Sequence, residues 1–209
     1  TLFRSGEMLT EGTGTAQDLA EGRKWIEKAA AQKEPRGQYL LGMLYLEGRG
    51  VGRNIAGGAG LIRSAAEAGD RDARFHLALL YGNGMGVAKN DKQAFEWLRK
   101  SADQGQREAE YWLAAIHARG LYGVKQDDEA AVVWLRRSAL QGYAPAQYAL
   151  GLAYADGRGV AKDAVEAYTW FRKAAENGNR EAAALVKKVE SGRTKVQPLV
   201  PLPGGTGPR

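Results

Sequence analysis

A short loop containing the pattern Gly-x-Gly recurs about every 36 residues along this chain. Four copies share the same spacing between their glycines, and a further copy carries one inserted residue. A fixed period of this length is typical of proteins built by stacking one small supersecondary unit many times. The copies are Glu11-Gly12-Thr13-Gly14-Thr15, Glu47-Gly48-Arg49-Gly50-Val51, Asn83-Gly84-Met85-Gly86-Val87, Arg119-Gly120-Leu121-Tyr122-Gly123-Val124 and Asp156-Gly157-Arg158-Gly159-Val160.

Other positions repeat in phase with the loop, which separates a true repeat from scattered glycines. One column is mostly tryptophan, one is aromatic, one is leucine, and one holds pairs of small residues. These columns are Trp25, Leu61, Trp97, Trp134 and Trp170; Tyr39, Phe75, Tyr111 and Tyr148; Leu41, Leu77, Leu113 and Leu150; and Ala29-Ala30, Ala65-Ala66, Ser101-Ala102, Ser138-Ala139 and Ala174-Ala175.

Each repeat is predicted to fold as two antiparallel helices. Leu41, Leu44 and Tyr45 are spaced by three and four, as on one face of a helix. The second helix is expected to begin after an Asp or Asn that caps it, and glycines are expected to end both helices. No segment alternates with period two, so no strand is predicted. The capping residues are Asp18, Asn54, Asn90, Asp127 and Asp163.

The chain therefore predicts one elongated repeat domain over residues 1–190, followed by a different segment. The predicted repeats cover residues 1–34, 35–70, 71–106, 107–143 and 144–179, with a capping helix over 180–190. Helix pairs of this size cannot bury their apolar stripes alone, so they are expected to stack into a solenoid. Residues 191–209 hold four of the six prolines and no acidic residue, which favours an extended tail.

The pattern resembles the Sel-one-like repeat family, a relative of the tetratricopeptide repeats. The resemblance rests on Tyr39, Leu41-Gly42, Tyr45, Gly48-x-Gly50-Val51, Asn54 and Ala65-Ala66-x-x-Gly69 and their equivalents. It implies an all-α, right-handed superhelical solenoid of about five helix-turn-helix repeats. It also implies a scaffold that binds other proteins, among them bacterial cell-envelope adaptors and immunity proteins that neutralise secreted toxins.

Composition excludes several classes of site. The chain has no cysteine, so disulfides and thiolate chemistry are absent. No apolar run approaches the length of a membrane span. Phe3 and Gly6 fall in the columns of Tyr39 and Gly42, so the chain begins inside a first helix, and we expect the natural protein to extend upstream. A periplasmic or cell-envelope location is the expectation, with the cytoplasm as the alternative.

The first helices are expected to line a concave face that binds another protein or a peptide. Aromatic rings and methionine on a preformed surface are typical of such recognition, although the aromatic column could instead belong partly to the core. The predicted partner-binding residues are Tyr39, Met43, Glu47, Phe75, Leu79, Asn83, Tyr111, Arg119, Tyr148, Leu152 and Asp156.

The second helices carry a column of cations that offers an alternative, binding of an anionic polymer such as peptidoglycan, exopolysaccharide or lipid. The chain has a formal net charge of +6. Acidic residues lie four positions after several of these cations, so local pairing is expected to occupy much of the ridge. Nucleic acid is not expected as a partner. The cations are Arg63, Arg99, Arg136 and Arg172, with Lys28, Lys100, Arg137 and Lys173 beside them.

No enzymatic site, metal site or cofactor is predicted. The two histidines, His76 and His117, occupy different columns and lack companions at ligand spacing. The glycine loops end helices, whereas phosphate-binding glycine loops follow a strand and open a helix. The sequence thus favours a non-catalytic binding scaffold.

Two segments leave alternatives open. Gly57, Gly58 and Gly60 lie inside a predicted helix, where each glycine costs about 1 kcal/mol relative to alanine. They reflect either drift or a site where a partner backbone or the chain's own tail approaches closely. In the tail 196–209, Leu199, Val200 and Leu202 either belong to a linker or dock against a solenoid of this chain or of another copy. Leu121 and Tyr122, in the longer loop, are expected to project outward.

Overall fold

The computed structural model describes residues 1–192, and within them the chain forms eleven α-helices and no β-strand. The predicted all-α fold of helix-turn-helix repeats is confirmed. The predicted docking of Leu199, Val200 and Leu202 lies outside the described residues. The helices are α1 (Leu2–Glu11), α2 (Leu19–Ala31), α3 (Pro35–Glu47), α4 (Ile55–Glu67), α5 (Arg71–Asn83), α6 (Asp91–Asp103), α7 (Arg107–Arg119), α8 (Asp128–Leu140), α9 (Ala144–Asp156), α10 (Ala164–Glu176) and α11 (Arg180–Glu190).

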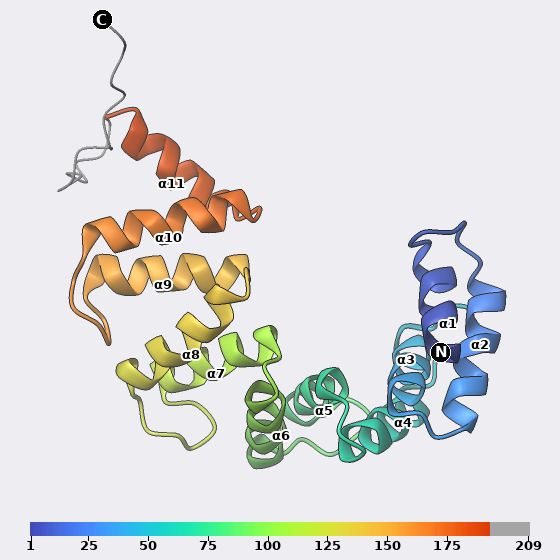
Figure 1. Ribbon diagram of the computed structural model, residues 1–209. Helices are drawn as coiled ribbons and strands as arrows, with labels where there is room; N and C mark the ends of the chain where they lie inside the picture. Colours follow the sequence, from blue (N-terminus) through green and yellow to red (C-terminus); the bar gives the residue numbers. More distant parts are fainter. Residues whose placement is uncertain (193–209) are drawn as a thin grey trace, which may run out of the picture. The chain divides into compact units, whose positions relative to one another are not determined.

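The chain divides into two compact units at the start of α7 (Figure 1). The N-terminal unit, Thr1–Ala109, contains the helix pairs α1/α2, α3/α4 and α5/α6. The C-terminal unit begins at Glu110; in it α7 packs on α8, α9 packs on α10, and α11 packs on α10. Within each unit, the second helix of one repeat also contacts the first helix of the next, so the core is continuous between repeats.

Each second helix begins where the sequence predicted, because an Asp or Asn side chain caps it. The Asn90 side chain accepts a hydrogen bond from the Gln93 backbone N–H at 3.0 Å, and the Asp127 side chain accepts one from Ala130 at 2.9 Å. Such a bond satisfies one of the N–H groups that the first turn leaves without a partner. Asp18, Asn54 and Asp163 cap their helices in the same way.

The two glycines of the loop in the third repeat have different roles. Gly84 ends α5 in the left-handed conformation (φ 67°), and its N–H bonds to the Leu80 carbonyl. Gly86 also has positive φ, and a Cβ there would lie 2.8 Å from the carbonyl oxygen of Ile55 in the preceding repeat. The first glycine therefore stops the helix, and the second allows the loop to contact the neighbouring repeat.

The three glycines of α4 do not interrupt it, and one of them has a packing role. A Cβ on Gly58 would lie 2.7 Å from the Gly42 carbonyl oxygen of α3 and 3.0 Å from the Leu46 side chain. Gly60 is exposed, with nothing within 4 Å of an added Cβ. A close approach of another backbone to α4 therefore does occur, at Gly58, and the approaching backbone is that of α3 in the same repeat.

The core of each unit is built from the repeated apolar and small columns. In the N-terminal unit the side chains of Ile26, Ile62 and Leu77 are fully buried. In the C-terminal unit Leu150 is fully buried and packs in one cluster with Trp170 and Phe171. Alanines from the paired small positions lie between the helices, so the backbones approach closely and leave the remaining faces of the first helices free for other roles.

Candidate functional site

The predicted binding residues fall into two groups in the structure. The rings of Tyr39 and Phe75 are buried, with 8% and 7% of their surface exposed, so they contribute to the core. Tyr111 and Tyr148 are partly buried. The other predicted residues are partly or fully accessible on the first helices: Met43, Glu47, Leu79, Asn83, Arg119, Leu152 and Asp156.

A further column on the first helices was missed by the sequence reasoning. It follows the aromatic column by one residue and comprises Leu40, His76, Trp112 and Ala149. Positions 40, 43 and 47 are spaced by three and four, so they share one helical stripe, and this spacing was the signal that could have identified the column. Trp112 is 46% exposed, which is unusual for a side chain of this size. We call these stripes, taken within each unit by itself, the first-helix face.

In the N-terminal unit this face carries a closed polar cluster centred on Arg36. One guanidinium nitrogen of Arg36 donates to Glu7 of α1 at 2.8 Å, and the other donates to Asp72 of α5 at 2.6 Å. Burial opposes the charge of Arg36, but the hydrogen bonds that its guanidinium donates to Glu7 and Asp72, together with their negative charges, outweigh burial and raise the pKa of Arg36. The cluster therefore joins three consecutive first helices, and its charges are already partnered.

Tyr39 and His76 extend this cluster. The guanidinium of Arg36 lies 4.9 Å from the centre of the Tyr39 ring. The Tyr39 hydroxyl lies 3.3 Å from Nδ1 of His76, which also lies 3.0 Å from the Asp72 carbonyl oxygen. Burial, followed by the negative charge of Asp72, raises the pKa of Tyr39. These contacts stabilise the stack of repeats, so the arrangement here is structural.

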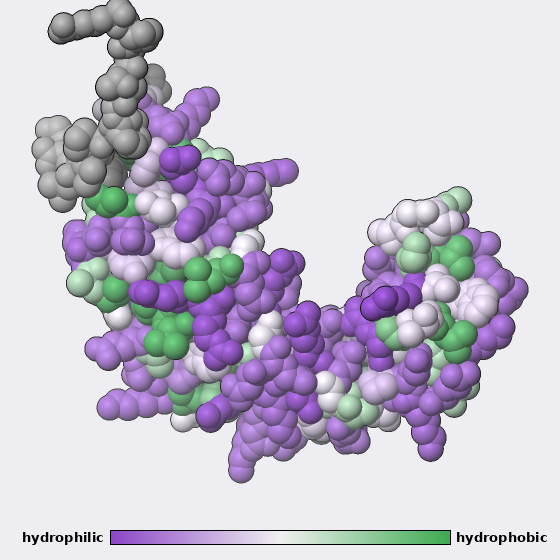
Figure 2. Space-filling view, viewed as in Figure 1, coloured by the Kyte–Doolittle hydropathy of each residue, from purple (hydrophilic) through white to green (hydrophobic). Residues whose placement is uncertain are grey.

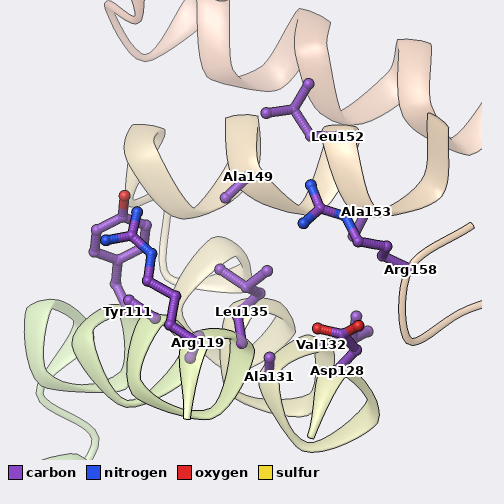
Figure 3. Close-up of a pocket in the computed structure, with 13 residues that line it drawn as sticks. Tyr111, Arg119, Asp128, Ala131, Val132, Leu135, Ala149, Leu152, Ala153 and Arg158 are labelled. Carbon is purple, nitrogen blue, oxygen red and sulfur yellow. The ribbon is translucent and has the colours of Figure 1, made fainter. Parts of the chain in front are cut away.

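The C-terminal unit presents a different surface, an open hollow of about 230 Å³ between α7, α8 and α9 (Figure 3). We call it the alanine hollow, because alanines from all three helices line it together with Val132, Leu135 and Leu152. It also includes three of the predicted site residues: Tyr111, Arg119 and Leu152. The alanines are Ala114, Ala115, Ala118, Ala131, Ala149 and Ala153.

Comparison between repeats explains why the hollow lies here. Ala115 occupies the column that holds Met43, Leu79 and Leu152 in other repeats. Ala149 occupies the column that holds Leu40, His76 and Trp112. Because both positions carry the smallest side chain of their column, space is left above the floor formed by α8. The hollow depends on small side chains at two positions in adjacent repeats, so no single sequence motif predicts it.

Charged groups flank the alanine hollow. Arg119 is the last residue of α7, Asp128 is the first residue of α8, and Arg158 lies in the loop after α9. In Figure 3 the Arg119 guanidinium extends toward the Tyr111 side of the hollow, and Arg158 and Asp128 lie on the other side. Arg158 contacts the exposed carboxylate of Asp156 at 3.4 Å, whereas the Arg119 side chain has no hydrogen bond or ion pair within residues 1–192. An arginine without a partner thus lies at the edge of an apolar floor.

Hydrophobic residues also gather around α8 and α9 on the face of the C-terminal unit that Figure 2 shows, among hydrophilic ones. On the outer side of α8, Val133 and Leu140 are exposed. Leu121 and Tyr122 in the long loop are exposed as predicted, and Tyr122 adopts positive φ (55°), which is uncommon for a residue other than glycine.

The cations of the second helices are largely engaged within the chain. Lys28, Lys100, Arg137 and Lys173 each lie over the indole ring of the tryptophan three residues earlier, 4.1 to 4.7 Å from its centre. The second repeat lacks both partners, with Leu61 and Ser64 at these positions. The cation and the tryptophan occur together in four repeats and are both absent from the second, which indicates that the cation packs on the indole ring as part of the fold.

The other column of cations is also paired. Arg99 contacts Asp103 at 4.0 Å and Arg172 contacts Glu176 at 3.4 Å, as the spacing predicted. Arg63 lies over the ring of Tyr81, and Arg136 donates to the Tyr154 hydroxyl at 2.7 Å. The ridge therefore offers few cations without a partner for a polyanion.

The described residues hold no group of three or more His, Asp or Glu side chains arranged to bind a metal ion. Along the same 192 residues, none of the helices combines the length and apolarity needed to cross a bilayer. The first-helix face exposes apolar side chains, the indole ring of Trp112 and the charged side chains of Glu47, Arg119 and Asp156.

Comparison with known proteins agrees with this architecture. The Sel1 repeat model matches residues 2–34, 35–70, 71–106, 107–143 and 144–179. No curated protein sequence is a match. A Sel1 repeat protein from Oxalobacter formigenes is 30% identical, with a TM-score of 0.78 over 90% of this chain and 74% of its own. The protective antigen c5321 of uropathogenic Escherichia coli, which has an SLR fold, is 32% identical, with a TM-score of 0.78 over 92% of this chain.

This chain covers only 41% of the Escherichia coli protein. The immunity protein PA5088 from Pseudomonas aeruginosa is similar in fold, with 22% identity and a TM-score of 0.63 over 94% of this chain and 70% of its own. Because the family model matches all five repeats, the chain belongs to the Sel1 repeat family.

Proposed function

We propose that this protein is a non-catalytic scaffold that binds another protein or a peptide through its first-helix face. The alanine hollow carries the proposal, because it is a preformed concave surface with an apolar floor and a charged rim. Interfaces concentrate their binding energy in such pockets, where a partner's side chain is shielded from water. Sel1 repeats commonly mediate protein interactions and generally have no catalytic role.

The exposed side chain of Trp112 supports the same face as the binding surface. Tryptophan is enriched among the residues that dominate interface energies, and its exposure leaves apolar area in water that a partner could cover. The predicted residues Met43, Leu79, Tyr111 and Leu152 are also accessible on first helices.

A more specific form of the proposal is an immunity protein that neutralises a secreted toxin in the bacterial cell envelope. Proteins named as immunity proteins, including PA5088, share the fold at about 20% identity. An inhibitor of this kind needs only a rigid binding surface and no chemistry. The test expresses each neighbouring gene alone and together with this one. This form of the proposal predicts that one neighbour arrests growth and that co-expression restores it, and it is removed if no neighbour is toxic or if growth stays arrested.

The alternative, an anionic polymer bound along the second helices, is disfavoured by the contacts of the cations with tryptophans and carboxylates. Variants separate the two functions. Binding through the first-helix face predicts that Trp112→Ala, Tyr111→Ala or Met43→Ala weakens partner binding. Charge reversal at Arg99 or Arg136 is expected to have little effect. Polymer binding predicts the opposite result, with a steep dependence on salt concentration.

A further inference from the structure

We infer that the alanine hollow binds a segment of the partner in which one apolar side chain, the size of Leu or Phe, lies next to an Asp or Glu. This inference rests on the proposed function, and it specifies the chemistry of the segment that enters this one site. The apolar side chain fills the hollow, and the acidic side chain contacts Arg119.

The size and lining of the hollow favour a single apolar side chain. Small-molecule sites usually enclose roughly 300–1,000 Å³, and this one has about 230 Å³. Its floor is formed by alanines with Val132, Leu135 and Leu152, which offer no side-chain hydrogen-bond partner. A polar side chain placed there would lose its hydrogen bonds with water without compensation.

The rim favours a carboxylate beside that side chain. Arg119, Asp128 and Arg158 line the hollow, and Asp156 contacts Arg158, so the guanidinium of Arg119 is the positive charge that remains without a partner. The planar fork of a guanidinium matches both oxygens of a carboxylate. Arg119 has no partner among residues 1–192 and is exposed, so it is available for such a contact.

A general preference for cations at helix C-termini does not explain Arg119. The helix dipole favours a cation at the last turn. The equivalent residues at the ends of the other first helices, however, are Glu11, Glu47, Asn83 and Asp156, none of them cationic. The arginine is thus specific to the repeat that contains the hollow.

We assign the carboxylate that contacts the hollow to an Asp or Glu side chain within a continuous segment of the partner. Tyr111 and Arg119 both line the hollow and lie about 12 Å apart along α7 at 1.5 Å per residue. An extended chain spans that length with about four residues, and the hollow is open toward solvent, so the segment can continue beyond it.

The test uses fluorescein-labelled nine-residue peptides with amidated C-termini and the full 209-residue chain. One peptide places Leu between two Asp residues in a Gly/Ser background. A second replaces both Asp with Lys, and a third replaces Leu with Ser. Fluorescence anisotropy is expected to show the first peptide binding at least about tenfold more tightly than the other two, with affinity falling as salt rises.

Two variants locate the binding, each with a matched control. Ala115→Leu fills the hollow with a residue that other repeats carry at this position, and Arg119→Glu reverses the charge of the rim. Each is expected to weaken binding of the Asp-Leu-Asp peptide at least about tenfold. Ala184→Leu and Arg99→Glu, at exposed positions on α11 and α6, are expected to leave it unchanged. Circular dichroism verifies that all four variants keep the helical fold.

Several results would overturn the inference. They are equal affinity for the three peptides, absence of binding at millimolar concentrations, or retention of binding by Ala115→Leu. A partner protein whose binding is lost in Trp112→Ala but kept in Ala115→Leu and Arg119→Glu would refute the inference about the hollow. That result would leave the proposed function of the first-helix face standing, so the two failures can be told apart.

Discussion

Two glycines on the same helix, Gly58 and Gly60, are expected to respond in opposite directions to the same substitution. At Gly60 an added methyl group meets nothing within 4 Å. At Gly58 it would lie 2.7 Å from the Gly42 carbonyl oxygen and 3.0 Å from Leu46 Cδ2. Both residues lie inside α4, so the intrinsic preference for alanine is similar at both, and the difference between the variants isolates the packing of α3 against α4.

The magnitudes follow from these distances. Alanine is favoured over glycine inside a helix by about 1 kcal/mol, so Gly60→Ala should raise the free energy of unfolding by up to that amount. Gly58→Ala has the same gain, but α3 and α4 must separate to admit the methyl group. Overpacking of this kind costs about 1–3 kcal/mol. The net effect is a loss of about 1 kcal/mol, and the two variants should differ by about 2 kcal/mol.

Urea unfolding followed by circular dichroism measures the difference. For a chain of this size, 1 kcal/mol corresponds to a shift of about 2–4 °C in melting temperature, so thermal unfolding provides a second readout. The reasoning is refuted if both variants are stabilised equally, because the contact between α3 and α4 at Gly58 would then carry no energetic consequence.

Three further substitutions test other contacts. Arg36→Met should lower the free energy of unfolding by about 2 kcal/mol, because Glu7 and Asp72 both lose the guanidinium that bonds them. Urea unfolding measures this loss, and a value below about 0.5 kcal/mol would contradict the role of the cluster. Asn90→Ala removes the cap of α6 and should cost about 1 kcal/mol in the same assay, whereas an unchanged unfolding midpoint would count against the capping account. Burial raises the pKa of Glu110, despite its contacts with Arg137 and Gln141, so the folded state disfavours the ionised form. Glu110→Gln should therefore gain stability relative to the wild type as pH rises from the ordinary carboxyl pKa through the raised value; a stability difference that does not vary with pH would contradict this prediction.

The fold was predictable because each repeat carries local signals that agree with one another. Asp18, Asn54, Asn90, Asp127 and Asp163 mark the beginnings of the second helices, and every one of them caps its helix in the structure. These signals act within a few residues, so they can be read in one repeat and checked in the next.

The site was only partly predictable, because its features arise between repeats. The hollow depends on Ala115 and Ala149 lying in adjacent repeats, and small residues at either position alone carry no functional signal. Tyr39 and Phe75 were predicted as binding residues, with a partly buried aromatic column as the alternative, and their rings are buried. The position after this column carries the exposed Trp112 in the fourth repeat. A shift of one residue moves a side chain by about 100° around a helix, so the exposure of each column depends on the packing between repeats.

The pairing of cations with tryptophans shows a signal that the sequence did contain. Lys100 follows Trp97 by three residues, a spacing at which side chains meet on a helix. The same spacing occurs in four repeats, and the second repeat, with Leu61 and Ser64, lacks both members. Comparing the tryptophan and cation columns would have predicted that these cations pack on the indole rings and stabilise the fold.

Site-specific photo-crosslinking in the native cell tests most directly the claim that the first-helix face is the binding surface. A benzophenone amino acid is placed at Leu152, on the first-helix face, or at Thr169, exposed on the second helix α10. We expect one discrete partner band crosslinked from position 152 and none from position 169. A partner crosslinked from position 169 and absent from position 152 would contradict the account.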